Sequence, residues 1–272
     1  YTLTINPYAD FSAGETITLS INTSVQTARG VRMDSDFTST FTAIATTPTP
    51  ISVGGTLTSD AHWTTGNVYL VTSDFTIPGG ATLTIDPGVV VKFDATTSSS
   101  YPRCDMVVSG ALDLRSTSSE KIVFTSSRDD QYGGDSNGDG VSTSPATNNW
   151  GSLKYNNPNN ILHDVVVRYG GVADYNSNPY LVWVSGGAAG TLEIRDSVIE
   201  HAYSRAVYAA DGAATVAIVR SAINNAGTYG VEVISGQVFL DAVSISQYGS
   251  AGVRLGGGSV SVTHSNFADV AN

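Results

Sequence analysis

The chain has 272 residues, of which 41% are hydrophobic and 14% are charged, and it carries a formal net charge of −11 at pH 7. This length allows one large domain or two. The acidic balance argues against a nucleic-acid partner, because a phosphate backbone needs a basic face. No apolar run is long enough to cross a bilayer. Cys104 is the single cysteine, so an internal disulfide is excluded.

Residues 1–46 contain short segments in which apolar and polar side chains alternate, as they do in antiparallel strands. The clearest segments are residues 15–21 and 37–43, with Gly30 in the turn between them. Together with YTLTI at residues 1–5, this order resembles the closing strands of a bacterial immunoglobulin-like (Ig-like) β-sandwich. A partial sandwich leaves an apolar face and a strand edge uncovered, so we expect either preceding residues or another chain to complete it.

The segment TTPTP at residues 46–50 predicts a stiff, extended linker because of its prolines. We therefore divide the chain into two domains, residues 1–46 and 47–272. Bulky residues such as His62 and Trp63 predict a cap near residues 61–80 that closes the N-terminal end of the second core. The run DFTIPGGATLTIDPGVVVKFD at residues 74–94 then alternates apolar residues between Pro-Gly turns. It resembles the first coils of many secreted bacterial β-helix proteins.

An acidic insertion follows this run and ends before Trp150. It contains the pattern D-x-N-x-D-G, in which oxygen-bearing side chains on alternate residues and a glycine at the bend can wrap a calcium ion. The twelfth position of an EF-hand loop would be Ala146, which has no carboxylate, so an EF-hand is excluded. The expected calcium ligands are Asp129, Asp130, Asp135, Asn137 and Asp139. The alternative is a solvated acidic turn.

From Gly190 onward the chain repeats one pattern four times, with alternating apolar residues typical of strands. Two apolar columns line up: Ile194, Ile218, Leu240 and Val262 in the first, and Ile199, Ile223, Ile245 and Phe267 in the second. The steps are 24, 22 and 22 residues, which predicts a solenoid of stacked strands. Ser197 and Ser221 fit the pattern L-x-I-x-x-S-x-I, and the repeats resemble right-handed parallel β-helix proteins. The resemblance implies an all-β fold and carries no reaction with it.

One group of polar residues invites a catalytic interpretation, because the register places Arg168 above Glu200 and Tyr169 above His201. Coils stacked about 4.8 Å apart produce ordinary ion pairs in this way, so we predict no catalytic residue here. Several aromatic residues could line a sugar-binding face, although core filling explains them as well. They are Tyr155, Tyr169, Tyr180, Trp183, Tyr203 and Tyr208.

The expected function is that of a non-enzymatic structural or adhesive protein, extracellular or on a bacterial cell surface. It would be a β-helix building block of a fibre, sheath or larger surface protein, stabilised by calcium. The coil pattern reaches Asn272 without a capping sequence, so we expect self-association through chain ends or continuation in a longer chain. The alternatives are a carbohydrate-active β-helix enzyme that cleaves acidic polysaccharide and a sugar-binding module without turnover.

Overall fold

The structure is a computed structural model that describes residues 16–27, 29–42, 49–95, 104–171, 179–185 and 187–268. The chain divides into two compact units, Tyr1–Thr47 and Pro48–Asn272. All described elements are strands. The described residues include no helix that could span a membrane.

The first unit contains strands β1 (Thr16–Ile21) and β2 (Phe37–Thr42), which pair antiparallel from Thr16↔Thr42 to Ile21↔Phe37. Alternate residues of β1 are half-buried, and the residues between them are exposed. The predicted antiparallel strands are therefore confirmed, but the predicted alternation appears in the burial of β1 alone, because residues 37–41 of β2 are all exposed. The expected strand at residues 1–5 lies outside the described residues, and the Ig-like assignment stays a prediction.

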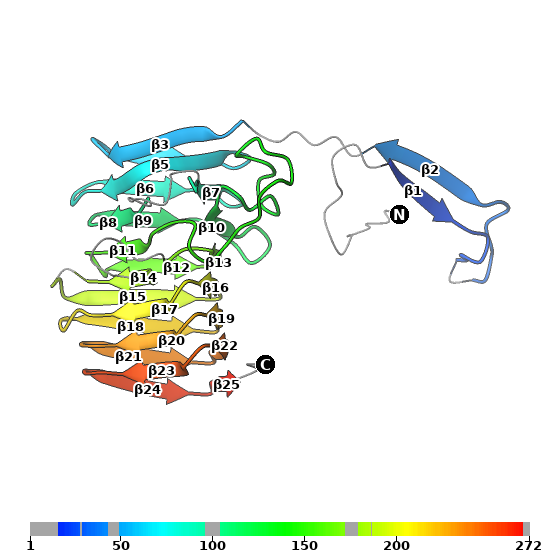
Figure 1. Ribbon diagram of the computed structural model, residues 1–272. Coiled ribbons are helices and arrows are strands. Elements are labelled where there is room, and N and C mark those ends of the chain that lie inside the picture. Colours follow the sequence, from blue (N-terminus) through cyan, green and yellow to red (C-terminus); the bar gives the residue numbers. More distant parts are fainter. Residues whose placement is uncertain are drawn as a thin grey trace. The chain divides into compact units, whose positions relative to one another are not determined.

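The second unit is a stack of parallel strands wound in coils, as the repeats predicted (Figure 1). Each complete coil contributes one strand to each of three faces. Face A contains β8 (Met106–Val108), β11 (Leu153–Tyr155), β14 (Tyr180–Val184), β17 (Arg205–Ala209), β20 (Tyr229–Val233) and β23 (Ala251–Leu255). Face B contains β7 (Val90–Phe93), β10 (Ile122–Ser126), β13 (Val165–Arg168), β16 (Val198–Ala202), β19 (Ala222–Ala226), β22 (Ser244–Tyr248) and β25 (Asn266–Ala268).

Face C contains β4 (Ala61–Trp63), β6 (Thr82–Ile85), β9 (Ala111–Leu114), β12 (Asn160–His163), β15 (Gly190–Arg195), β18 (Ala214–Val219), β21 (Gln237–Asp241) and β24 (Ser259–Thr263). The long strand β5 (Val68–Ile77) joins faces A and B, because its first half pairs with β7 and its second half with β8. Strand β3 (Ile51–Thr56) pairs with β5 in turn. The residues of the expected cap near 61–80 thus form strands of the stack itself.

The register confirms both predicted apolar columns. Ile194, Ile218, Leu240 and Val262 are partners along face C, and Ile199, Ile223, Ile245 and Phe267 are partners along face B. Most of these side chains are 0–1% exposed, whereas Val262 is 44% and Phe267 38% exposed in the last described coil. The continuous apolar core inside the coils holds the stack together.

Two corners of the coil use left-handed backbone at residues other than glycine. The corner from face C to face B contains Asp164, Asp196, Arg220, Ala242 and His264. The corner from face B to face A begins at Tyr169, directly after β13, and at His201, Asn225 and Gln247, the next-to-last residues of β16, β19 and β22. Their φ angles lie between 44° and 66°. Each corner therefore presents a column of mostly polar side chains along the outside of the stack.

Candidate functional sites

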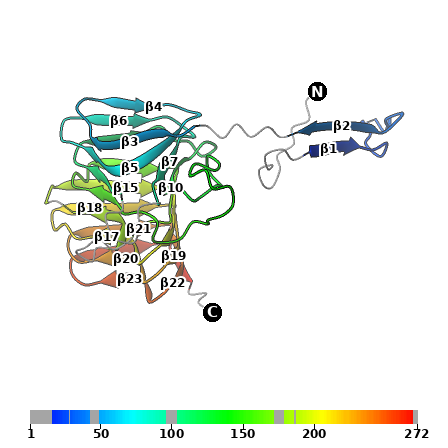
Figure 2. The same cartoon turned by 45° about the horizontal axis from the view of Figure 1, so that its top comes forward.

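The acidic insertion lies between β10 and β11, and its first residues pack against strands of face B (Figure 2). Asp129 is 2% exposed, accepts a hydrogen bond from the Thr125 hydroxyl at 2.5 Å and lies 3.5 Å from Nε of Arg168. Its carboxylate is thus engaged by groups of the stack. At the other end of the insertion, the indole ring of Trp150 stacks on the ring of Phe93 with 4.0 Å between the ring centroids, which anchors this end to the stack.

Two buried cations lie beneath the insertion. Lys92 on β7 has no exposed surface, and its ammonium donates to the carbonyl oxygen of Gly134 at 2.5 Å. Burial lowers the pKa of Lys92 to about 8, opposed by the nearby carboxylates. Arg168 on β13 is 8% exposed, donates to Oε1 of Gln131 at 3.1 Å and lies 3.4 Å from Glu200. The insertion is therefore fixed to face B by charged side chains of the strands.

The D-x-N-x-D-G pattern folds around Asp135. The carboxylate of Asp135 accepts hydrogen bonds from the backbone N–H groups of Gly138, Asp139 and Gly140, at 2.8, 3.2 and 2.8 Å. Oδ2 of Asp139 accepts from Nδ2 of Asn137 at 2.9 Å and from the Thr143 hydroxyl at 2.5 Å. These bonds bring the amide of Asn137 beside the carboxylate of Asp139.

Three side-chain oxygens of the insertion are buried and accept no hydrogen bond: Oδ1 of Asp130, Oδ1 of Asn137 and Oδ1 of Asp139. Burial raises the pKa of Asp130, Lys92 opposes this effect, and neighbouring carboxylates including Asp135 add to it. Among the described residues, no three His, Cys, Asp or Glu side chains come together as a metal site on their own. The predicted ligands therefore divide into two engaged carboxylates, Asp129 and Asp135, and three residues with an unpartnered oxygen.

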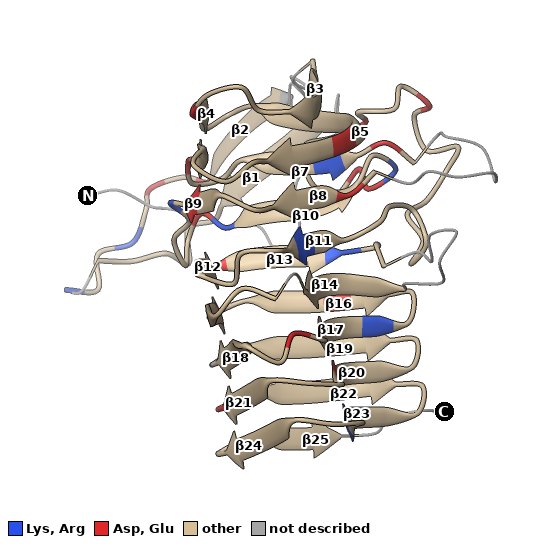
Figure 3. Cartoon of the chain, turned by 90° about the vertical axis from the view of Figure 1, so that its left-hand side faces the viewer, with Lys and Arg blue, Asp and Glu red and all other residues tan. Residues whose placement is uncertain are grey.

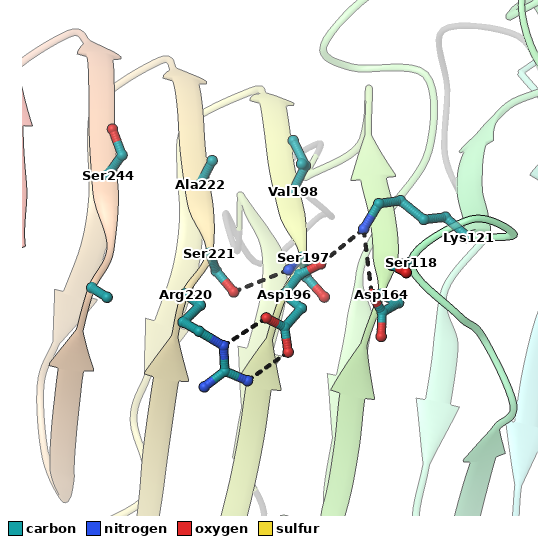
Figure 4. A pocket seen from close by; sticks show the side chains of 11 residues that line it. Ser118, Lys121, Asp164, Asp196, Ser197, Val198, Arg220, Ser221, Ala222 and Ser244 are labelled. Atoms are coloured by element: carbon teal, nitrogen blue, oxygen red, sulfur yellow. Dashed lines mark hydrogen bonds and ion pairs between the residues drawn. The ribbon is translucent and has the colours of Figure 1, made fainter. Parts of the chain in front are cut away.

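A second candidate site is an open pocket of about 820 Å³ along the corner between faces C and B (Figure 4). Nζ of Lys121 lies 3.7 Å from Asp164 and donates to the carbonyl oxygen of Asp196 at 2.9 Å. The guanidinium of Arg220 donates to both oxygens of Asp196, each at 2.7 Å. These hydrogen bonds lower the pKa of Asp196, so this group stays ionised near neutral pH and makes a poor general acid.

The predicted ion pair between coils, Arg168–Glu200, is confirmed at 3.4 Å, and Arg220–Asp196 forms a second pair of this kind at 2.7 Å. The rings of Tyr169 and His201 stack with 4.8 Å between their centroids. Burial lowers the pKa of His201, so its imidazole is neutral at pH 7.

A third candidate site follows the outer surface of face A, and we call it the Arg–Tyr strip. It comprises Lys154, Tyr180, Trp183, Arg205, Tyr208, Tyr229, Glu232 and Arg254. Rings of Tyr180 and Tyr208 stack at 3.7 Å, and the Arg205 guanidinium lies 5.6 Å from the rings of both Tyr180 and Tyr229. In Figure 3 the strands β11, β14, β17, β20 and β23 of this face lie one below another.

Glu232 is the buried centre of the strip. It is 1% exposed, pairs with Nε of Arg205 at 2.7 Å and also contacts the guanidinium of Arg254. Tyr180, Trp183 and Tyr208 were among the aromatic residues considered from the sequence for a sugar-binding face, whereas the cations and Glu232 were not predicted. The spacing in the sequence could have revealed this column, because its members follow one another at the length of a coil. The structure shows them as register partners: Trp183, Tyr208, Glu232 and Arg254.

Comparison with known proteins gives one match. Residues 55–184 match a family model described as a pectate-lyase-like beta helix domain. No curated protein and no solved structure matches the chain. The matched residues include the acidic insertion and end with β14, before most of the Arg–Tyr strip. This part of the chain is thus similar to a pectate-lyase-like beta helix domain, and the stacked sheets show that the second unit has a parallel β-helix fold.

Proposed function

We propose that the chain is a non-enzymatic structural or adhesive module of a bacterial protein that is extracellular or on the cell surface. The observation that carries this proposal is the pairing of the outward acidic side chains. Asp164 lies beside Lys121, Asp196 beside Arg220, and Glu232 between two arginines. Ion pairs of this kind join neighbouring coils, which suits a rigid wall. At Asp196 the hydrogen bonds from Arg220 also lower the pKa of the carboxyl group, which makes it poorly suited to donate a proton.

A glycoside hydrolase needs one carboxyl group that is protonated near neutral pH and a second one facing it across the sugar. Among the described carboxyl groups, a raised pKa is resolved for Asp130, which lies in the insertion and away from the corner pocket. The pKa of Asp196, in that pocket, is shifted the other way. This distribution of pKa values favours the non-enzymatic proposal over the carbohydrate-active enzyme.

The test is incubation of the purified chain with uronic-acid polymers and neutral glucans, with calcium and with chelator. Reducing ends report hydrolysis, and ultraviolet absorbance of unsaturated products reports elimination. We expect neither signal to exceed that of the heat-denatured protein. Product formation that is lost in Asp196→Asn or Asp164→Asn would overturn the proposal and place an enzyme at the corner pocket.

The building-block part of the proposal is supported by the last described coil. Val262 and Phe267 continue the two apolar columns but are 44% and 38% exposed. We propose that a further coil of a longer chain or a second copy of this chain covers them. Light scattering should then detect self-association of the isolated chain, and Val262→Asp should reduce it. A wild-type monomer at high protein concentration would contradict association through this end.

The Arg–Tyr strip supports a second candidate, a sugar-binding module without turnover. Flat rings offer stacking surfaces for pyranose rings. Lys154, Arg205 and Arg254 outnumber the one carboxylate, Glu232, so the strip carries a cationic excess on an acidic chain. Guanidinium groups bind carboxylates well. An acidic polysaccharide therefore matches the strip better than a neutral one.

Affinity electrophoresis in gels containing a uronic-acid polymer or a neutral glucan tests this candidate. We expect retardation by the acidic polymer alone, and less of it for Arg254→Gln, whose side chain is 44% exposed. The matched control is Arg115→Gln, directly after β9 of face C, where the arginine side chain is 56% exposed and pairs with Asp113. Equal retardation of both variants would show a non-specific charge effect and remove the strip as a binding site.

A further inference from the structure

Glu232 differs from the other charged residues of the Arg–Tyr strip, because it is acidic and almost completely buried. Its strand, β20, pairs with β17 on one side and with β23 on the other. The Glu232 carboxylate lies 2.7 Å from Nε of Arg205 on β17 and also contacts the guanidinium of Arg254 on β23. One carboxylate from the middle coil therefore holds two arginines from the coils on either side.

The carboxylate and the two cations differ in their access to solvent. Glu232 is 1% exposed, whereas the side chains of Arg205 and Arg254 are 25% and 44% exposed. A molecule in solution therefore reaches the two arginines, while the carboxylate that pairs with them stays covered.

Both arginines have further contacts within the strip. Arg205 donates from Nη1 to the Ser204 hydroxyl at 3.1 Å, and its guanidinium lies 5.6 Å from the centre of the Tyr229 ring. The guanidinium of Arg254 lies 5.4 Å from the centre of the same ring. Tyr229 and Glu232 thus gather two positive charges at one place, on a chain whose formal net charge is −11.

Glu232 brings to these arginines the same chemical group that a uronic-acid sugar would bring. Guanidinium groups bind carboxylates through charge-assisted hydrogen bonds, and an N–H group that donates to Glu232 is not available to a ligand. The charge of Glu232 also offsets one of the two positive charges. We propose that Glu232 is an internal competitor for Arg205 and Arg254, and that it limits how tightly the strip binds an acidic polysaccharide. This inference rests on the sugar-binding candidate proposed above, and it names the residue that regulates the same site.

Competition of this kind makes the strip selective for a polymer. A single carboxylate gains little from a guanidinium that is already paired with Glu232, and a repulsive group of this kind is a common source of specificity. A polymer places several carboxylates along the strip, whose residues extend from β11 to β23, so that each further contact forms at a high effective concentration.

The test is affinity electrophoresis of the whole chain in gels with increasing amounts of a uronic-acid polymer, compared with gels without polymer. Glu232→Gln removes the internal carboxylate and should lower the dissociation constant about two- to fivefold, which is the effect of one partly exposed ion pair. The matched control is Asp113→Asn on face C, which makes the same change in net charge at a 48% exposed carboxylate. Its dissociation constant should equal that of wild type.

A double variant separates competition from a general effect of charge. With Arg254→Gln already present, Glu232→Gln should have a smaller effect, because one of the two arginines that it releases is gone. If Glu232→Gln does not fold, as circular dichroism can show, Glu232→Ser takes its place and leaves room for water at both guanidinium groups. A Glu232 variant that binds the polymer no more tightly than wild type, or an equal gain in Asp113→Asn, would overturn this inference alone. If neither wild type nor the Glu232 variant is retarded, the sugar-binding candidate fails as well.

Discussion

Lys92 is wholly buried beneath the acidic insertion, and this position makes the stability of the protein depend on pH above neutrality. Burial lowers its pKa from 10.5 to about 8, although Asp129, Asp130 and Asp135 act in the opposite direction. At a pH between these two pKa values, Lys92 binds more protons in the unfolded chain than in the folded chain. The free energy of unfolding must therefore rise with pH in this window.

The size of the rise follows from the two pKa values. From pH 7.5 to 9, proton linkage at Lys92 adds about 1.2 kcal/mol to the free energy of unfolding. Cys104 opposes it, because burial and nearby carboxylates raise the pKa of its thiol from 9.0 to about 11. An acid with a raised pKa loses stability as pH rises, here by about 0.4 kcal/mol over the same range. The net expectation is a rise of about 0.8 kcal/mol.

Urea unfolding at several pH values between 7.5 and 9, in chelator, measures this effect on wild type and on Lys92→Met. The wild-type protein should gain stability with pH, whereas Lys92→Met should lose about 0.4 kcal/mol because the Cys104 contribution remains. If Lys92→Met does not fold, Cys104→Ser should show the full rise of about 1.2 kcal/mol. A wild-type stability that is flat or falls over this range, with Cys104→Ser behaving alike, would refute the reasoning.

Further predictions concern the apolar core, two glycines and the thiol. Ile218→Ala, in the buried column, should cost about 3 kcal/mol by urea unfolding, whereas Val262→Ala, 44% exposed, should cost under about 1 kcal/mol. Gly227→Ala should cost more than about 2 kcal/mol, because its Cβ would lie 2.1 Å from a backbone oxygen of the previous coil. Gly66→Ala, at φ +82° in open space, should cost about 1 kcal/mol. Cys104, 2% exposed, should react with iodoacetamide at pH 8 only after unfolding, as mass spectrometry can show.

The stacked coils could be predicted from the sequence because strand alternation and a constant step leave a direct record in it. Ile194 and Ile218 are 24 residues apart in the sequence and are partners in the sheet. The insertion could be located for the same reason, since it interrupts the pattern. The surroundings of its carboxylates could not be predicted. Lys92 lies 42 residues before Gly134, and nothing local to either residue indicates that the strand beneath supplies a buried ammonium.

The Arg–Tyr strip was missed for a related reason. Its column depends on the register of face A, where Trp183 pairs with Tyr208, and Tyr208 with Glu232. These residues follow one another at about the length of a coil, but polar side chains on the outside do not mark a column as clearly as buried apolar ones. Sequence periodicity therefore records the inside of a solenoid, while its outer surface needs the register to be known.

The left-handed corners were also hidden, because residues other than glycine occupy them, and Ala242 permits a direct test. Its φ angle is 54°, a conformation that costs an L-residue about 1–2 kcal/mol. Its side chain is exposed, so little packing is lost in Ala242→Gly, although glycine adds an entropic cost of about 0.5–1 kcal/mol. We therefore expect Ala242→Gly to stabilise the protein by about 0.5–1 kcal/mol in urea unfolding.

The control is Ala217→Gly in β18, which pairs with Glu193 and Phe239 in extended strands and should destabilise the protein by about 0.5–1 kcal/mol. The two substitutions remove the same methyl group from neighbouring coils, so their difference isolates the backbone conformation of the corner. If both variants lose stability equally, the left-handed backbone at Ala242 carries no strain that glycine relieves, and the prediction is wrong. A gain of stability in Ala242→Gly together with a loss in Ala217→Gly would show that the fold forces the corner residue into the left-handed conformation.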